Sequence, residues 1–123
     1  MIVGVGTDII EIDRIGRSIE RGGNHFKDYV YSRSEIEYCE SKKGYESFAA
    51  RFAAKEAFSK AMGTGIGKDL SFKDIEVIND KRGKPSIIYH GDLLNNYKDY
   101  SIHLSLSHSK TDAIAYVVVE AVE

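Results

Sequence analysis

Residues 45–62 read YESFAARFAAKEAFSKAM, and this stretch decides the fold. It is rich in alanine, contains neither glycine nor proline, and is followed directly by Gly63. Alanine favours the helical backbone, and a glycine is typical of the position at which a helix ends. The sequence therefore predicts a central helix over residues 45–62, which is the longest helical segment of the chain.

Strand and helix patterns lie on both sides of this helix. Residues 2–10 alternate as a strand does, and Gly4 and Gly6 allow another element to approach that strand closely. Apolar residues then recur at helical spacing over 11–20, until Gly22 and Gly23 stop the pattern. We expect shorter helices over 26–31, over 34–41 with an N-cap at Ser34, and over 92–97. Strands are predicted at 75–78, 86–89, 102–106 and 113–122, with a turn over 79–85, so the fold class is α+β.

Length and charge limit what the protein can do. The 123 residues form a single predicted domain, 1–123, and the net charge of −2 provides no general basic field for nucleic acid. No apolar stretch approaches the roughly 20 residues of a membrane helix, and the opening segment lacks the pattern of a secretion signal. The single cysteine, Cys39, suits a reducing compartment. We expect a cytoplasmic protein without membrane or nucleic-acid partners.

The strand predicted at 113–122 is apolar on both of its faces. Two arrangements explain this pattern equally well. The second face is buried either by another copy of the chain or by a helix on each side of the sheet.

Two carboxylates stand out among apolar neighbours. Glu56 falls in the helical stripe that contains Phe48 and Phe52, where an ionised group is costly unless it is paired, protonated or bound to a metal. Asp8 lies at the end of the first strand. A structural ion pair explains Glu56 equally well, and an N-cap at the helix beginning at Glu11 explains Asp8. If the two converge, they form an oxygen site of the kind that Mg²⁺ uses together with substrate phosphates and water.

Zinc is less favoured than Mg²⁺, and basic residues for a phosphate substrate lie nearby. The four histidines show no close ligand spacing and Cys39 stands alone, which argues against zinc. Basic residues that could contact a phosphate lie on the same helix as Glu56: Arg51, Lys55 and Lys60.

Four segments together resemble a known family. They are GVGTDIIEIDRI at 4–15, RFAAKEAFSKAMGTGIG at 51–67, the turn at 79–85, and LSLSHS at 104–109. The sequence is similar to the holo-[acyl-carrier-protein] synthases, the small-subunit class of 4'-phosphopantetheinyl transferases. The resemblance implies an antiparallel sheet packed against a long central helix, and a homotrimer with active sites between subunits. It also implies transfer of the 4'-phosphopantetheine arm of coenzyme A to a serine of apo acyl carrier protein, releasing adenosine 3',5'-bisphosphate, for fatty acid biosynthesis.

The resemblance also assigns roles to residues. Asp8 and Glu56 would hold Mg²⁺ against the pyrophosphate, with Glu56 also acting on the attacking serine through a bound water. Lys60 would neutralise the charge on the leaving phosphate. Lys60 would thus contact coenzyme A, and the nucleotide end would be held by Arg51, Gly83, Lys84, Pro85 and His108.

The exposed face of the first helix carries three arginines, Arg14, Arg17 and Arg21. Such a face is ordinarily just solvated. Because acyl carrier proteins are strongly acidic, the resemblance implies that these arginines bind the carrier protein. At Asp112 the sequence departs from the family, which often has an aromatic residue there, so the packing of the last hairpin is not predicted.

Two other functions remain open on the residues alone. A metal-dependent phosphohydrolase could use Asp8 and Glu56 without a carrier protein. A non-catalytic module could bind acidic proteins through Arg14, Arg17 and Arg21, but it would have no reason to place Glu56 on an apolar stripe.

Overall fold

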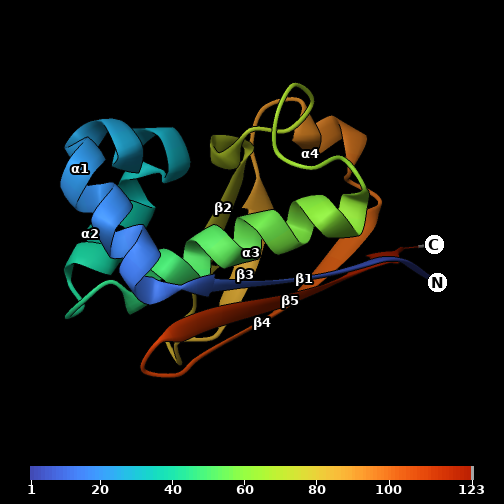
Figure 1. Cartoon of the computed structure of the whole chain (residues 1–123). Helices are drawn as coiled ribbons and strands as arrows, with labels where there is room; N and C mark the ends of the chain where they lie inside the picture. Colours follow the sequence, from blue (N-terminus) through green and yellow to red (C-terminus); the bar gives the residue numbers. More distant parts are fainter. Residues whose placement is uncertain (123) are drawn as a thin grey trace.

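A three-stranded antiparallel sheet supports the central helix in the computed structural model, which describes residues 1–122 (Figure 1). The order of elements is β1 (Ile2–Glu11), α1 (Ile12–Val30), α2 (Arg33–Glu40), α3 (Glu46–Met62), the 3-10 turn η1 (Phe72–Asp74), β2 (Ile75–Asn79), β3 (Pro85–Tyr89), α4 (Leu93–Asn96), β4 (Tyr100–His108) and β5 (Asp112–Ala121). The sheet order is β1-β5-β4, and β2 and β3 form a separate hairpin. The predicted α+β class, with an antiparallel sheet against a long helix, is confirmed.

Two glycines of β1 allow the sheet to lie close against the helix. A Cβ atom added to Gly4 would lie 2.1 Å from the Ala61 carbonyl oxygen, and one added to Gly6 would lie 1.9 Å from the Ala57 carbonyl oxygen. Any side chain at either position would push β1 away from α3. The glycines therefore allow the close approach that the sequence predicted, and they place Asp8, on the same face of β1, against the helix.

The central strand β5 is apolar on both faces, but only one face is covered. Ala113, Ala115, Val117 and Val119 are fully buried under α3, whereas Ile114 and Tyr116 are 41% and 49% exposed on the other side. Figure 1 shows the helices of the described chain on one side of this sheet. The arrangement with a helix on each side is therefore wrong, and the outer face is bare in the single chain.

The N-terminus of α2 differs from the prediction. Its N-cap is Ser32 rather than Ser34: Ser32 Oγ accepts from the Glu35 N–H at 3.2 Å, and Glu35 Oε1 accepts from the Ser32 N–H at 2.9 Å. The Ser34 hydroxyl instead donates to the Glu76 carboxylate on β2. Ser32 and Glu35 thus form a reciprocal capping box at the start of α2.

Glu76 is the centre of a polar cluster that joins α2 to the β2–β3 hairpin. Its carboxylate accepts from Ser32 Oγ at 2.6 Å, from Ser34 Oγ and from His90 Nε2 at 2.7 Å. Burial raises the pKa of Glu76, but these hydrogen bonds outweigh burial and lower the pKa to about 2.

Two further details of the prediction are confirmed. The backbone of α1 is not helical at Gly23, where φ is +53° and ψ is −133°, so the helix is broken there into two segments, as the sequence predicted. The predicted hairpin is present, and Gly83 adopts φ +88° in its turn. No helix among residues 1–122 is long and apolar enough to cross a membrane.

Candidate active site

Three charged side chains meet where β1 lies against α3. Lys60 donates to Asp8 Oδ1 at 3.0 Å and to the Thr7 carbonyl oxygen at 3.1 Å. Asp8 is paired with Ala115 inside the sheet, and the N-cap of α1 is Glu11, so the interpretation of Asp8 as an N-cap is wrong. Within the described chain Lys60 pairs with Asp8, and Glu56 has no ion-pair partner, so Glu56 is not a structural ion pair either.

Glu56 lies close enough to Asp8 for the two carboxylates to repel each other. Burial, and then the charge of Asp8, raise the pKa of Glu56, while the Lys60 ammonium lowers it. A cation between the two carboxylates would offset both the burial of their charges and their mutual repulsion. Hard oxygen donors suit Mg²⁺, and the described chain offers no third carboxylate, histidine or cysteine to complete a cluster. The pair therefore fits an ion whose remaining ligands are water and substrate phosphate.

The face of α3 that carries Glu56 is not the buried stripe that the helical spacing predicts. Phe52 and Glu56 are only partly buried and Lys60 is exposed, whereas Ala53, Ala57 and most other residues of the helix are buried. The helix is enclosed by the sheet on one side and by α1, α2 and β2 on the other. Glu56 therefore belongs to a strip of the helix that a ligand can reach.

Lys55, which the sequence offers as a phosphate contact, is turned into the core instead. Its ammonium is 0% exposed and donates to Glu35 Oε1 at 2.7 Å and to the Val30 carbonyl oxygen at 2.6 Å. Burial lowers the pKa of Lys55 and the Glu35 carboxylate raises it. Because Glu35 Oε2 also accepts the Val77 N–H at 2.9 Å, this buried ion pair joins α2, α3 and β2, and Lys55 is unavailable to a phosphate.

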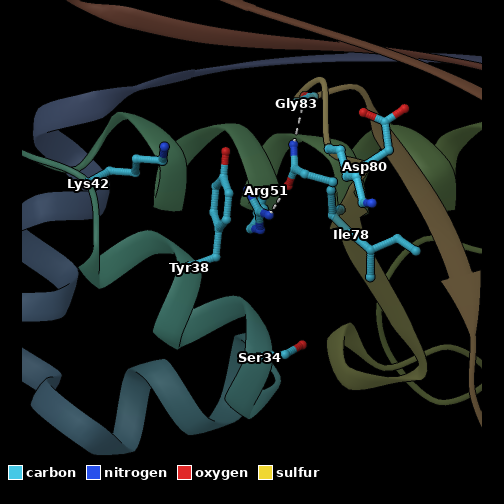
Figure 2. Close-up of a pocket in the computed structure, with 10 residues that line it drawn as sticks. Ser34, Tyr38, Lys42, Arg51, Ile78, Asp80 and Gly83 are labelled. Carbon is cyan, nitrogen blue, oxygen red and sulfur yellow. Dashed lines mark hydrogen bonds between the residues drawn. The ribbon is translucent and has the colours of Figure 1, made fainter.

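The residues assigned to the nucleotide end gather beside a different part of α3. A pocket of about 210 Å³ is lined by Arg51, Gly83, Pro85 and His108, together with residues of α2 and β4. Lys84 lies on the same turn but is not among the residues that line this pocket. An adjoining pocket of about 430 Å³ shares Tyr38, Arg51, Asn79 and Gly83 with it (Figure 2).

Arg51 stands between the two pockets, nearly buried at 3% exposure. Its guanidinium lies 4.2 Å from the ring centre of Tyr38, and one Nη donates to Asn79 Oδ1. Its Nε has no hydrogen-bond partner within the described residues. Sequence reasoning missed Tyr38 and Asn79: nothing marks Tyr38, and Asn79 was interpreted only as part of a turn. A buried guanidinium with an unpartnered N–H suits an anionic ligand.

The remaining expected residues lie at the surface. Arg14, Arg17 and Arg21 are exposed on α1, at spacings that place them on one side of the helix. At the last hairpin, the Ser109 N–H donates to the Asp112 carbonyl oxygen at 2.8 Å and Ser109 Oγ accepts from the Asp112 N–H at 3.1 Å. Asp112 is thus accommodated by a polar turn.

Comparisons with known proteins show which family the chain belongs to. Residues 4–118 match the family model of the 4'-phosphopantetheinyl transferase superfamily. The holo-[acyl-carrier-protein] synthase of Ruminiclostridium cellulolyticum is 52% identical over 120 residues, covering 94% of this chain and 90% of that protein.

Solved structures give the same result. The holo-(acyl-carrier-protein) synthase of Bacillus anthracis, in complex with CoA (3',5'-ADP), is 47% identical with a TM-score of 0.84 and covers 98% of both chains. The synthase of Helicobacter pylori, in complex with coenzyme A, is 39% identical with a TM-score of 0.87, covering 94% of this chain and 99% of that one. These matches decide against the phosphohydrolase and the non-catalytic module. The chain belongs to the 4'-phosphopantetheinyl transferase superfamily, as the resemblance predicted, and is a transferase of the holo-[acyl-carrier-protein] synthase type.

Proposed function

We propose that this protein transfers the 4'-phosphopantetheine arm of coenzyme A to a serine of apo acyl carrier protein, with Asp8, Glu56 and Lys60 as its catalytic residues. The observation that carries the proposal is the meeting of two carboxylates and one ammonium where β1 lies against α3. In the reaction a serine oxygen forms a bond to the phosphorus of the arm, and the bond to adenosine 3',5'-bisphosphate breaks. Positioning and neutralisation of charge are the main contributions a protein can make to such a step.

Asp8 and Glu56 would hold the magnesium ion. A bound magnesium ion would neutralise charge on the pyrophosphate oxygens. Glu56 would also act on the attacking serine through a bound water molecule, which would pass the serine proton to its carboxylate. Lys60 keeps half of its side chain exposed, so its ammonium can reach the leaving phosphate while it remains paired with Asp8.

Coenzyme A would bind with its nucleotide end in the pocket beside Arg51. The buried, partly unpartnered guanidinium supports a phosphate contact, and the Gly83–Pro85 turn and His108 form the adjoining wall. Lys84 would act as a charged residue at the rim of this site, because its side chain is exposed beside the pocket.

The acidic carrier protein would dock on α1 through Arg14, Arg17 and Arg21. These arginines are exposed on α1, which begins at Ile12, four residues after Asp8, so a bound carrier protein could present its serine to the carboxylates. Opposite charges on two partners accelerate their encounter, even though the net charge of this chain is −2.

The active form would be a homotrimer in the cytoplasm. The outer face of the sheet supports self-association, because apolar residues from two neighbouring strands are exposed there: Val5 at 51%, Ile9 at 65%, Ile114 at 41% and Tyr116 at 49%. Contiguous apolar surface of this kind is typical of interfaces. Analytical ultracentrifugation should show a trimer, and transfer activity that is unchanged in a monomer would contradict this part of the proposal.

Intact-mass spectrometry tests the reaction directly. Apo acyl carrier protein incubated with this protein, coenzyme A and Mg²⁺ should gain the mass of one phosphopantetheine, and a chelator should prevent the gain. Glu56→Gln keeps the shape of the side chain but removes its charge, so transfer should be lost while the fold is kept or stabilised. Glu37→Gln, an exposed position on α2, is the matched control and should transfer normally. Transfer at the wild-type rate by Glu56→Gln would remove Glu56 from the mechanism.

A further inference from the structure

The turn between β2 and β3 is attached to α3 through one side chain. Asn79, the last residue of β2, is paired with Pro85 in the hairpin register and faces Arg51 across the boundary of the two pockets. Figure 2 shows the hydrogen bonds that it makes as dashed lines, one reaching Arg51 and the other reaching Gly83.

The chemistry of its neighbours determines how the Asn79 amide is oriented. Arg51 can only donate, so the amide oxygen must face it, and the Gly83 carbonyl can only accept, so the amide nitrogen must face that. Asn79 Nδ2 donates to the Gly83 oxygen at 3.0 Å, and Asn79 Oδ1 accepts from an Arg51 Nη. Each end of the amide therefore makes one contact within the protein, and together the two contacts fix its orientation.

These two contacts connect groups that belong to different elements. Arg51 comes from α3, and Gly83 comes from a turn in which it adopts φ +88°. Tyr38, from α2, supports the other side of the guanidinium, with its ring centre 4.2 Å away. The stacking of Tyr38 limits movement perpendicular to the guanidinium plane, whereas the Asn79 amide determines the direction in which the N–H groups point.

We propose that Asn79 is a positioning residue for coenzyme A, setting the direction of the Arg51 guanidinium relative to the backbone of the Gly83–Pro85 turn. This inference rests on the proposed function, because it takes Arg51 and that turn as the binding site of the nucleotide end. The reacting phosphorus lies at the pyrophosphate, where the pantetheine arm joins the nucleotide, whereas the contacts of Asn79 are with Arg51 and Gly83 and not with Asp8 or Glu56. Its loss should therefore weaken the binding of the nucleotide and leave the use of the carrier protein unchanged.

The test measures binding and turnover separately. Asn79→Ala removes both hydrogen bonds, one of which is charge-assisted, so the Kd for adenosine 3',5'-bisphosphate in calorimetry should rise about tenfold to a hundredfold. The KM for coenzyme A should rise by a similar factor, and the KM for apo acyl carrier protein should stay within about twofold of the wild type. Asn95→Ala, at an exposed position outside both pockets, is the matched control and should match the wild type.

A second variant separates positioning from a general loss of structure. Asn79→Asp keeps an acceptor for Arg51 but places a carboxylate against the Gly83 carbonyl, so it should also lose nucleotide affinity while its melting temperature changes little. If a folded Asn79 variant binds the nucleotide as the wild type does, the inference is wrong. If the wild type itself neither binds the nucleotide nor modifies the carrier protein, the proposed function fails instead, so the two failures are distinguishable.

Discussion

Gly6→Ala tests the link between the packing of β1 on α3 and the catalytic residues. The new Cβ would lie 1.9 Å from the Ala57 carbonyl oxygen, so strand and helix must separate by about 1.5 Å to reach ordinary van der Waals contact. The Cβ atom is fixed to the backbone of β1 and the oxygen belongs to the backbone of α3, so neither atom can rotate away as the end of a side chain can. Overpacking typically costs about 1–3 kcal/mol, and we expect the upper end here.

A loss of about 3 kcal/mol in a domain of this size lowers Tm by about 12 °C, which thermal denaturation followed by circular dichroism measures readily. The same separation moves Asp8 away from Glu56. Because a displacement of about 1 Å can cost a hundredfold in rate, transfer should fall by about that factor even at a temperature where the variant is folded.

Gly67→Ala is the matched control for this variant. A Cβ at Gly67 meets no atom within 4 Å, and Gly67 does not adopt a positive φ, so its Tm and activity should stay close to those of the wild type. A Gly6→Ala protein that melts within about 3 °C of the wild type would refute the reasoning, because it would mean that the sheet and the helix are not held together as tightly as described.

Three further predictions concern charged groups. The folded protein lowers the pKa of Glu76 from 4.5 to about 2, so the ionised carboxylate stabilises the fold above pH 4.5 and this stabilisation is lost as the pH falls through about 2. The difference in Tm between wild type and Glu76→Gln should therefore be large at pH 6 and should shrink toward zero between pH 4.5 and about 2. Lys55→Met leaves the buried Glu35 carboxylate without its cationic partner and should cost about 3–5 kcal/mol in denaturant unfolding, much of which Glu35→Gln should restore in the double variant. Arg14→Glu should raise the KM for apo acyl carrier protein at least tenfold while calorimetric binding of coenzyme A is unchanged, and equal losses of both would indicate misfolding instead.

Much of the fold could be predicted because it depends on local patterns. The alternation of residues 2–10, the alanine-rich run before Gly63 and the turn residues at 79–85 each determine their element without help from distant residues. The cap of α2 could not be predicted in this way. Ser32 and Ser34 are each followed three residues later by a glutamate, so both suit a capping box. The structure uses Glu35, the partner of Ser32, and Glu35 is also held by Lys55, 20 residues further along the chain.

The candidate site was likewise predictable only in part. Asp8 and Glu56 were chosen because a carboxylate among apolar residues is costly, and the structure brings them together. The burial of the helix was predicted less well, because a helical wheel assumes one buried face and α3 is enclosed on several sides. Lys55 was therefore taken for a phosphate contact, although its partner, Glu35, lies on another helix.

The central position of β5 in the sheet also affects how the chain folds during its synthesis. Thr7 on β1 donates to the Ala115 carbonyl oxygen across 108 residues, and β1 has no other strand beside it in the sheet. At a synthesis rate of about 5–20 residues per second, β1 waits roughly 5–20 s for its partner. During that time the alanine-rich side of α3 and both edges of β1 are unprotected. A nascent chain that stalls before residue 112 should therefore bind chaperones, whereas one that has released residues 112–121 from the ribosome should not.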